Sequence, residues 1–207
     1  MSLVDLLQEE ATRRDVWPSV DGLSPALAFM LVRDLPYQRS TSRQPEALLR
    51  EWRGTGSGKH YLLRGLLEEM GLGVRVVLAT HHFTEEYSEA LPPPLSALLE
   101  QGPIPDVHTF LRVEGAPGSW SDVDVTWPLL ARRLGLPANG AFRPGRDMRL
   151  ACTPLDVYEV PENADPEAAA ERLLEAHCGP DRPRHDRFMV GLDRWVWSTL
   201  YTGLDVL

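Results

Sequence analysis

The chain contains the stretch Gly54-Thr55-Gly56-Ser57-Gly58-Lys59-His60-Tyr61-Leu62-Leu63, in which a glycine-rich turn leads into a helix. Apolar residues then recur at i, i+3 and i+4, a spacing that predicts a helix with one buried stripe. Ser57 is the expected N-cap, because its hydroxyl can accept a hydrogen bond from an unpaired first-turn amide. Gly71 and Gly73 predict a left-handed end of this helix, and residues 74–79 then predict a buried strand. The positive end of the helix dipole is therefore directed at whatever occupies the loop.

A glycine-rich turn before a helix could form a phosphate-binding loop, but the residues of this turn do not match the phosphate-binding pattern. The Walker A pattern requires G-x-x-x-x-G-K-[ST] directly after a strand. Arg53 stands where the first glycine is required, and His60 replaces the hydroxyl residue that would hold magnesium. The preceding segment 45–52 has the pattern of a helix and not of a strand. The sequence therefore argues against nucleotide binding at residues 54–59.

The start of a helix can also hold a catalytic nucleophile, because the helix dipole there favours an anionic thiolate. Residues 53–81 resemble the nucleophile helix of the transglutaminase-like superfamily, whose fold is related to that of papain and whose motif here is G-[TS]-C-[ST]-x-K-H. Downstream, residues 106–113 resemble the histidine strand of that family. Residues 120–127 resemble its W-x-x-V-D-x-T-W strand. The resemblance covers roughly residues 45–130, with the motifs in the family's order.

The resemblance implies a triad from which the nucleophile is missing. In this family a cysteine thiolate attacks a carbonyl, a histidine exchanges its proton, and an aspartate fixes the imidazole tautomer. Carried over position by position, the base is His108 and the orienting acid is Asp124, while Gly56 occupies the cysteine position. Asp122 is a competing orienting acid on the same side of the strand. Ser57 is a nearby hydroxyl, but its expected role is the N-cap.

The order of expected elements is that of an α+β protein. Helices are expected at 3–14, 24–35, 45–52, 57–70, 95–101, 128–134, 166–178 and 184–200, and strands at 74–79, 107–113 and 119–125, with further possible strands at 148–150 and 157–160. Gly115–Gly118 predicts a hairpin turn, whereas Pro92–Pro94 are not expected in regular structure. We expect one domain over 1–207. Its core, 45–130, would have a transglutaminase-like, cysteine-proteinase-like fold in which the central helix packs on a mainly antiparallel sheet, and 131–207 would form an extension that packs on this core.

Composition limits the class of protein. The formal net charge of −9 and the isoelectric point of about 5.1 argue against nucleic-acid partners and anionic membranes, because phosphate contacts require a basic surface. No apolar run has the length of a membrane span, and no signal peptide is visible at the N-terminus. Cys152 and Cys178 lie far apart without metal-type spacing, so we expect a cytoplasmic protein with reduced thiols. Lys59 is the single lysine among 21 basic residues.

Several other residues have expected roles outside the catalytic set. Two groups of residues have side chains of the kinds that bind metal ions. The first group is His81, His82, Glu85 and Glu86, and the second is His177, Cys178 and His185. Neither group has a recognised zinc spacing, so we expect a solvated loop and a helix end, with no metal and no cofactor. Lys59 and His60 are expected to be structural or peripheral. Trp120 and Trp127 are expected to pack around the site.

Two functions fit these observations. The favoured hypothesis is a pseudoenzyme, whose cleft binds a peptide or a small acyl or amide compound without cysteine-dependent chemistry. The alternative is a hydrolase in which His108 and Asp124 act on an amide or ester without a cysteine nucleophile. A binder would show no turnover, and replacement of His108 would leave ligand affinity largely unchanged. An enzyme would lose turnover on the same replacement. The sequence leaves the ligand and the oligomeric state open.

Overall fold

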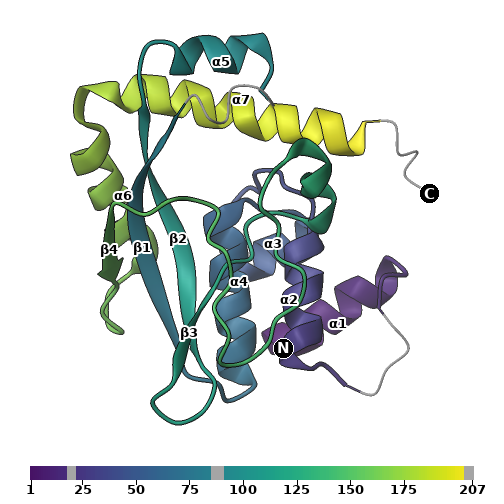
Figure 1. Ribbon diagram of the computed structural model, residues 1–207. Helices are drawn as coiled ribbons and strands as arrows, with labels where there is room; N and C mark the ends of the chain where they lie inside the picture. Colours follow the sequence, from purple (N-terminus) through teal and green to yellow (C-terminus); the bar gives the residue numbers. More distant parts are fainter. Residues whose placement is uncertain (18–21, 85–90, 203–207) are drawn as a thin grey trace.

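The structure, a computed structural model, describes residues 1–17, 22–84 and 91–202 of the 207-residue chain. Its helices are α1 (Leu3–Arg13), α2 (Pro25–Asp34), α3 (Pro45–Glu51), α4 (Gly56–Glu69), α5 (Pro93–Leu99), α6 (Pro166–Cys178) and α7 (Arg182–Tyr201), with the 3₁₀ helices η2 (Leu129–Leu134) and η3 (Gly179–Asp181). Its strands are β1 (Val74–Phe83), β2 (Ile104–Glu114), β3 (Trp120–Val123) and β4 (Asp156–Glu159) (Figure 1). All strand pairs are antiparallel, which confirms the α+β class.

The sheet has the strand order β3-β2-β1-β4. The β1–β2 pair is the longest and runs from Val74 opposite Val113 to Phe83 opposite Ile104. The predicted turn between β2 and β3 is confirmed, since the Gly115 amide donates to the Ser119 carbonyl at 2.9 Å. β3 pairs with only the last four residues of β2. The chain that follows β3 therefore leaves β2, and the part of β2 nearer its start has no strand on that side among the described residues.

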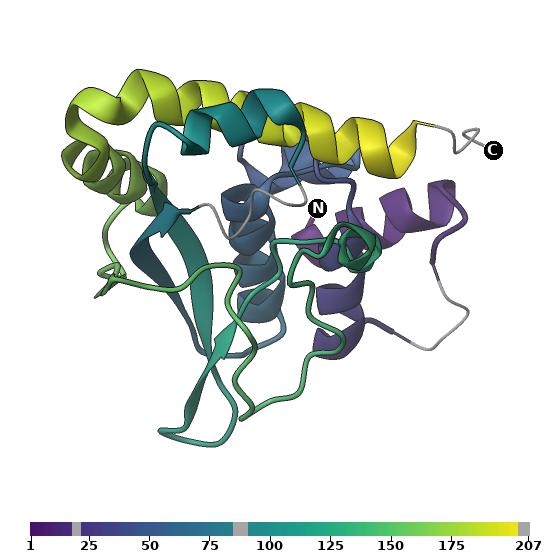
Figure 2. The same cartoon turned by 45° about the horizontal axis from the view of Figure 1, so that its top comes forward.

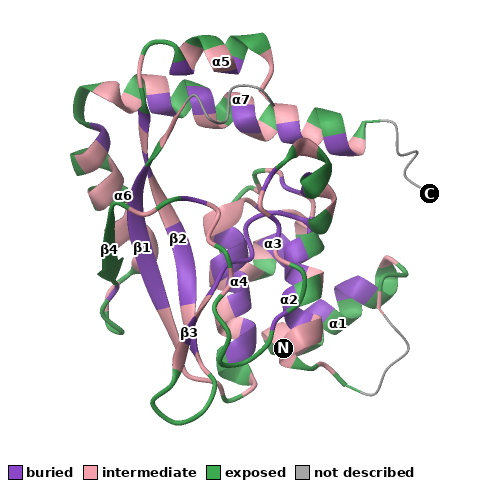
Figure 3. Cartoon of the chain, viewed as in Figure 1, coloured by how far each residue is buried: buried purple, intermediate pink, exposed green. Residues whose placement is uncertain are grey.

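Helix α4 forms the centre of the core, as its apolar stripe predicts. The buried residues of α4 and the sheet that form this cluster are Leu62, Leu63, Leu66, Leu67, Val76, Leu78, Leu111, Val113 and Val123. Each buried leucine contributes about 1.5–3 kcal/mol to stability relative to an exposed one. Because strand side chains alternate, the other face of the sheet carries Val77, Ala79 and Phe110, which Leu150 and Cys152 cover. The buried stripe of α4 that faces the sheet is visible in Figure 3.

Helix α7 lies across one end of the sheet, and α5 packs against it (Figures 1 and 2). The expected apolar stripe of this terminal helix is confirmed, because Phe188, Leu192, Val196 and Leu200 are buried in a second cluster with Leu95, Leu99 and Trp127. Helix α6 contacts β1 and β2, and it begins and ends where the sequence predicts. Among the residues that the structure describes, no helix is both long and apolar enough to span a membrane.

The start of α4 differs from the expectation. The helix begins at Gly56 with Thr55 as its N-cap residue, and Thr55 makes no side-chain capping hydrogen bond. Ser57 is therefore inside the first turn, and its prediction as the N-cap is wrong. The reason is that the Lys59 amide already donates to the Thr55 carbonyl, so the helical ladder begins two residues earlier than the apolar stripe indicates. At the other end, Gly71 has the predicted positive φ of 84°.

Four further segments correct the sequence-based assignment. Pro93 and Pro94 begin α5, where the first-turn amides need no partner, so the expectation of irregular structure was wrong. His81, His82 and Phe83 extend β1 and do not form a solvated loop. Residues 148–150 are not a strand. Residues 129–134 form a 3₁₀ helix.

Lys59 is fully buried and joins α4 to the end of α2. Its Nζ donates to the Arg33 carbonyl at 2.8 Å, and it lies 6.0 Å from the centre of the Tyr37 ring. The acceptor belongs to the last turn of α2, whose carbonyls have no partner within their own helix. Burial lowers the pKa of the Lys59 ammonium to about 7, although the Asp34 carboxylate opposes this change. Lys59 is therefore structural, as predicted, and it does not line the cavity described below.

The lowered pKa gives a testable pH dependence of stability. In the unfolded chain the amine binds a proton up to a pKa near 10.4, whereas the folded protein releases it near 7, so the unfolded state binds more protons between these values. Stability contributed by this site therefore rises with pH across that window. We expect the stability of the wild type relative to Lys59→Met to rise by about 1 kcal/mol per pH unit from pH 7 to 9. Urea unfolding of both proteins measures it; a difference that stays flat or falls would contradict the assignment.

Candidate functional site

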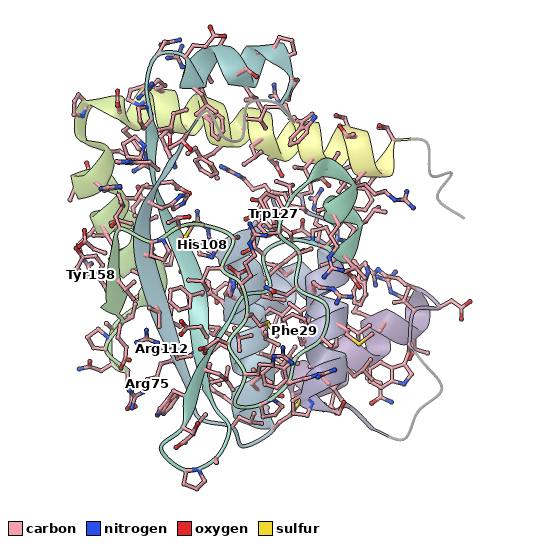
Figure 4. The ribbon with its side chains drawn as sticks, viewed as in Figure 1. Phe29, Arg75, His108, Arg112, Trp127 and Tyr158 are labelled. Carbon is pink, nitrogen blue, oxygen red and sulfur yellow. The ribbon has the colours of Figure 1, made fainter. Side chains whose placement is uncertain are left out.

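His108 and Asp124 form the hydrogen-bonded pair that the sequence predicts. His108 projects from the middle of β2 (Figure 4), and Asp124 is the first residue after β3. The distance between His108 Nε2 and Asp124 Oδ2 is 2.7 Å. Asp122, the competing acid, accepts a hydrogen bond from the Arg112 guanidinium at 3.0 Å and does not contact His108. The structure thus brings together the histidine and the acid that the motif selects.

Asp124 is held by several donors at once. Its Oδ1 accepts the Thr126 amide at 2.9 Å, and its Oδ2 also accepts the Ala151 amide at 2.7 Å. Burial acts to raise the pKa of Asp124, but His108 and these donors together hold it well below its ordinary value, so the group is a carboxylate. A carboxylate only accepts, so the proton between the two side chains is on Nε2 of His108. In the neutral imidazole, Nδ1 is then the basic nitrogen.

His60 connects the start of α4 to the chain that carries Asp124. Its Nδ1 donates to the Gly56 carbonyl at 2.7 Å, and its Nε2 accepts the Val125 amide at 3.1 Å. Burial lowers the pKa of His60 to about 4, so the ring is neutral at physiological pH. The His60 and His108 ring centres are 5.8 Å apart. His60 therefore has a structural role, which is one of the two roles expected for it, and it keeps Gly56 near His108.

A side chain added at Gly56 would be crowded by Thr126. A Cβ placed on Gly56 would lie 3.3 Å from Thr126 Cγ2 and 3.6 Å from its Oγ1. Such a contact is tight, so a side chain at this position requires a small movement of Thr126. Gly56 is the first residue of a 14-residue helix, where amides without intrahelical partners and the helix dipole favour negative charge. Thr126 thus partly occupies the space into which a side chain at position 56 would project.

A cavity of about 580 Å³ lies between these elements. It is bordered by the start of α4, by β2 where β3 no longer pairs with it, and by residues of α6 and α7. Gly56, Ser57, His108, Thr126 and Trp127 all line it. In Figure 4, His108 and Trp127 lie on opposite sides of the upper end of α4. Of the predicted site residues, Gly56 and His108 line this cavity, whereas Asp124 is buried and reaches it only through His108. The cavity is large enough for a small ligand.

Among the buried polar atoms without a hydrogen-bond partner within the described part of the chain, five belong to residues that line this cavity. They are Tyr61 Oη, His81 Nδ1, Thr126 Oγ1, Trp127 Nε1 and Asp193 Oδ1. Buried polar groups are nearly always paired, because an unmade hydrogen bond costs about 1–3 kcal/mol. The indole can only donate, the hydroxyl can donate or accept, and an imidazole nitrogen can do either according to its protonation. The cavity is therefore suited to a ligand or water with both donors and acceptors.

A second histidine–carboxylate cluster borders the same cavity, and the sequence did not indicate it. Asp106 accepts from His81 Nε2 at 3.0 Å and from His185 Nε2 at 2.9 Å. The other nitrogen of His185 lies 3.0 Å from an oxygen of Asp186. The hydrogen bonds from the two histidines, opposed by burial, lower the pKa of Asp106, while the two carboxylates raise the pKa of His185 against burial. The Asp106 carboxylate thus joins β1, β2 and α7.

The two cysteines do not supply a reactive thiol to the cavity. Burial raises the pKa of Cys152 to about 12, with a further contribution from Asp124. Burial likewise raises the pKa of Cys178 to about 11, and its thiol donates to the Pro105 carbonyl. Both are free and buried, and neither lines the cavity. Each is therefore a protonated thiol at neutral pH, which is a weak nucleophile.

The two tryptophans that the sequence places around the site differ in position. Trp127 lines the cavity and its ring centre lies 4.4 Å from that of Tyr37, whereas Trp120 lies at the far end of the hairpin against Arg75. The proposed placement of Trp120 beside the site was therefore wrong. Glu85 and Glu86 lie outside the described residues. Within the described residues, no group of three or more His, Cys, Asp or Glu side chains could hold a metal ion.

Comparisons with protein-family models, with curated proteins and with solved structures find no match to this chain. The family resemblance consequently depends on the motifs around Gly56, His108 and Asp124 and on the geometry in which the fold holds them.

Proposed function

We propose that this chain is a transglutaminase-like protein whose cavity binds a peptide or small acyl or amide compound without a covalent intermediate. The observation that carries the proposal is that several unpaired buried atoms belong to residues on one cavity, among them Thr126 Oγ1, Trp127 Nε1 and His81 Nδ1. An acyl carbonyl accepts hydrogen bonds, so the indole N–H and the threonine hydroxyl are suitable partners for it. The His81 imidazole can accept from an amide N–H when it is neutral and can donate to the acyl oxygen when it is protonated. Acyl amides therefore supply both kinds of group that the cavity lacks.

A covalent reaction of the family's type has no support in the residues around the cavity. Gly56 has no side chain at the nucleophile position, and both thiols are held in the protonated form. The Ser57 hydroxyl also lines the cavity, but it lies inside the first turn of α4, one residue beyond the nucleophile position. The chain is therefore proposed as a pseudoenzyme with respect to cysteine chemistry.

Hydrolysis by water is a second candidate function, and one observation favours it. The His108–Asp124 pair has the geometry of a working general base, with a 2.7 Å hydrogen bond and a carboxylate fixed by two backbone amides. The Nδ1 nitrogen of His108 is left to accept a proton from water. General-base catalysis of this kind contributes about 10²–10⁴-fold to a rate. The substrate would be an amide or ester bound in the same cavity.

Binding can be tested through the two tryptophans that differ in position. Acylated amino-acid amides are titrated into ¹⁵N-labelled protein while the indole N–H signals are followed. We expect the Trp127 signal to shift, and Trp127→Phe to weaken the affinity about five-fold or more, because one hydrogen bond of about 1 kcal/mol is lost while the ring is kept. Trp120→Phe is the matched control, since Trp120 contacts Arg75 and not the cavity. Equal effects of both variants, or no shift with any acyl amide, would reject the proposal.

Measurement of product release in the same samples distinguishes binding alone from hydrolysis. A protein that only binds leaves the acyl amide and its ester analogue intact, and His108→Ala changes the dissociation constant little. A hydrolase releases product, and His108→Ala abolishes that release.

A further inference from the structure

The cluster around Asp106 has a feature that ligand binding alone does not require. His81 uses Nε2 to bond Asp106, which leaves Nδ1 buried and without a partner among the described residues. His108 likewise uses Nε2 to bond Asp124. Both histidines line the cavity, and their ring centres are 6.3 Å apart. Two imidazoles, each oriented by its own buried carboxylate, therefore leave Nδ1 as the nitrogen that can act on a ligand.

We propose that His81 is a second proton-transfer residue of this cavity and acts as the general acid in the hydrolysis of amides and alkyl esters for which His108 is the general base. This inference rests on the second candidate function described above.

The reaction is balanced without any additional reactant. His108 Nδ1 accepts a proton from water while the water oxygen bonds to the acyl carbon. The bond from that carbon to the leaving nitrogen or oxygen breaks, its electron pair stays on the leaving atom, and His81 Nδ1–H protonates it. The products are a carboxylic acid and an amine or alcohol. One proton then passes from His108 to solvent and another from solvent to His81, which restores the starting state.

The charges around His81 allow it to carry the proton that a general acid needs. His185 is bonded through both ring nitrogens to the carboxylates of Asp106 and Asp186, an arrangement that requires the imidazolium form. With His81 also protonated, the two carboxylates and two imidazoliums sum to zero charge. Such pairing is the condition under which a buried charge is tolerated. The His177 ring adds a hydrogen bond of 3.2 Å to the His81 carbonyl, and the Phe83 ring packs against the His81 ring.

The separation of the rings also suits the two roles. A hydrogen bond from catalytic nitrogen to reacting atom spans about 2.6–3.2 Å. The attacking water and the leaving atom are both attached to the acyl carbon in the tetrahedral intermediate, so they lie close to each other. Rings whose centres are 6.3 Å apart leave no room for the acyl carbon between them, so both hydrogen bonds are made from one side, with the carbon on the cavity side of the two rings.

The test uses leaving groups that differ in their need for a proton. Acetate esters of p-nitrophenol, phenol and ethanol are compared as substrates, because p-nitrophenolate departs unprotonated whereas ethoxide does not. We expect His81→Gln to lower kcat/KM for the ethyl ester about 100-fold or more, while the value for the p-nitrophenyl ester stays within about threefold. His108→Ala should lower both. The retained p-nitrophenyl activity also shows that His81→Gln is folded.

His82→Gln is the matched control, since His82 is exposed, lies against the His177 ring and does not line the cavity. It should leave all three rates unchanged. If His81→Gln lowers every ester equally, or none, the acid role of His81 is wrong. If the wild type and His108→Ala are equally inactive on every ester, the inference fails as well, but the binding proposal stands as long as acyl amides shift the Trp127 indole signal.

Discussion

Gly56→Cys is expected to place a thiol at the start of α4 whose pKa lies below about 7, against about 8.5 for a free thiol. The first turn of α4 has amides without intrahelical partners, and the helix dipole adds a partial positive charge at this end. His108, when protonated, adds an opposite charge on the same cavity. All of these stabilise the thiolate relative to the thiol, and a shift of two pKa units corresponds to about 2.7 kcal/mol.

The measurement is the pH dependence of alkylation by iodoacetamide. At pH 6 the introduced thiol should react about tenfold faster than an exposed one, after allowance for the lower intrinsic nucleophilicity of a more acidic thiol. Ser119→Cys, on the exposed hairpin turn, supplies the exposed reference. The native thiols contribute little, because the pKa values of Cys152 and Cys178 are raised to about 12 and about 11.

Crowding by Thr126 requires its own control. The new Cβ would lie 3.3 Å from Thr126 Cγ2, so Gly56→Cys is also made together with Thr126→Ser, which removes that methyl group and keeps the hydroxyl. We expect the same midpoint in both backgrounds and a higher midpoint after a further His108→Ala. A midpoint near 8.5 that His108→Ala does not change would mean that the cavity lacks the geometry of a catalytic site.

The parts of this fold that could be predicted are those whose signals are local. Helix α4, the strand after it and the β2–β3 hairpin each follow from a continuous pattern of apolar residues bounded by glycines. The pairing of His108 with Asp124 spans only 16 residues and was identified from two motifs that lie on neighbouring strands. What those motifs could not supply was the support of the pair, because the Ala151 amide reaches Asp124 from a loop 27 residues away.

The cluster around Asp106 was missed for the same physical reason. His81 lies 25 residues from Asp106, and His185 lies 79 residues from it, so no periodic pattern connects them. The polar pair His81-His82 also interrupted the apolar run of β1 and suggested a loop. One local signal was available, because Asp106 precedes His108 by two residues on a strand and must face the same side. The position of β4 in the sheet could not be predicted either, because it pairs with Val77–Thr80, which lie far from it in the sequence.

Asp124→Asn is expected to lower the free energy of unfolding by about 3 kcal/mol at neutral pH. The carboxylate accepts from His108, from the Thr126 amide and from the Ala151 amide, and all of these donors are at least partly buried. An asparagine of the same shape has one accepting oxygen, so its NH₂ group must face at least one donor. Each buried donor left unpaired costs about 1–3 kcal/mol, and hydrogen bonds to a charged acceptor are the stronger ones.

Asp122→Asn is the matched control, because Asp122 is two residues earlier in the same chain and makes a partly exposed ion pair with Arg112. Pairs of that kind contribute about 0–1 kcal/mol, so the control should differ little from the wild type. For a chain of this length, the expected loss in Asp124→Asn corresponds to a fall in Tm of about 6–12 °C. Thermal and urea unfolding of the three proteins give the comparison. Equal stability of the two variants would mean that Asp124 does not hold β2, β3 and the Ala151 loop together. The orientation of His108 would then need another cause.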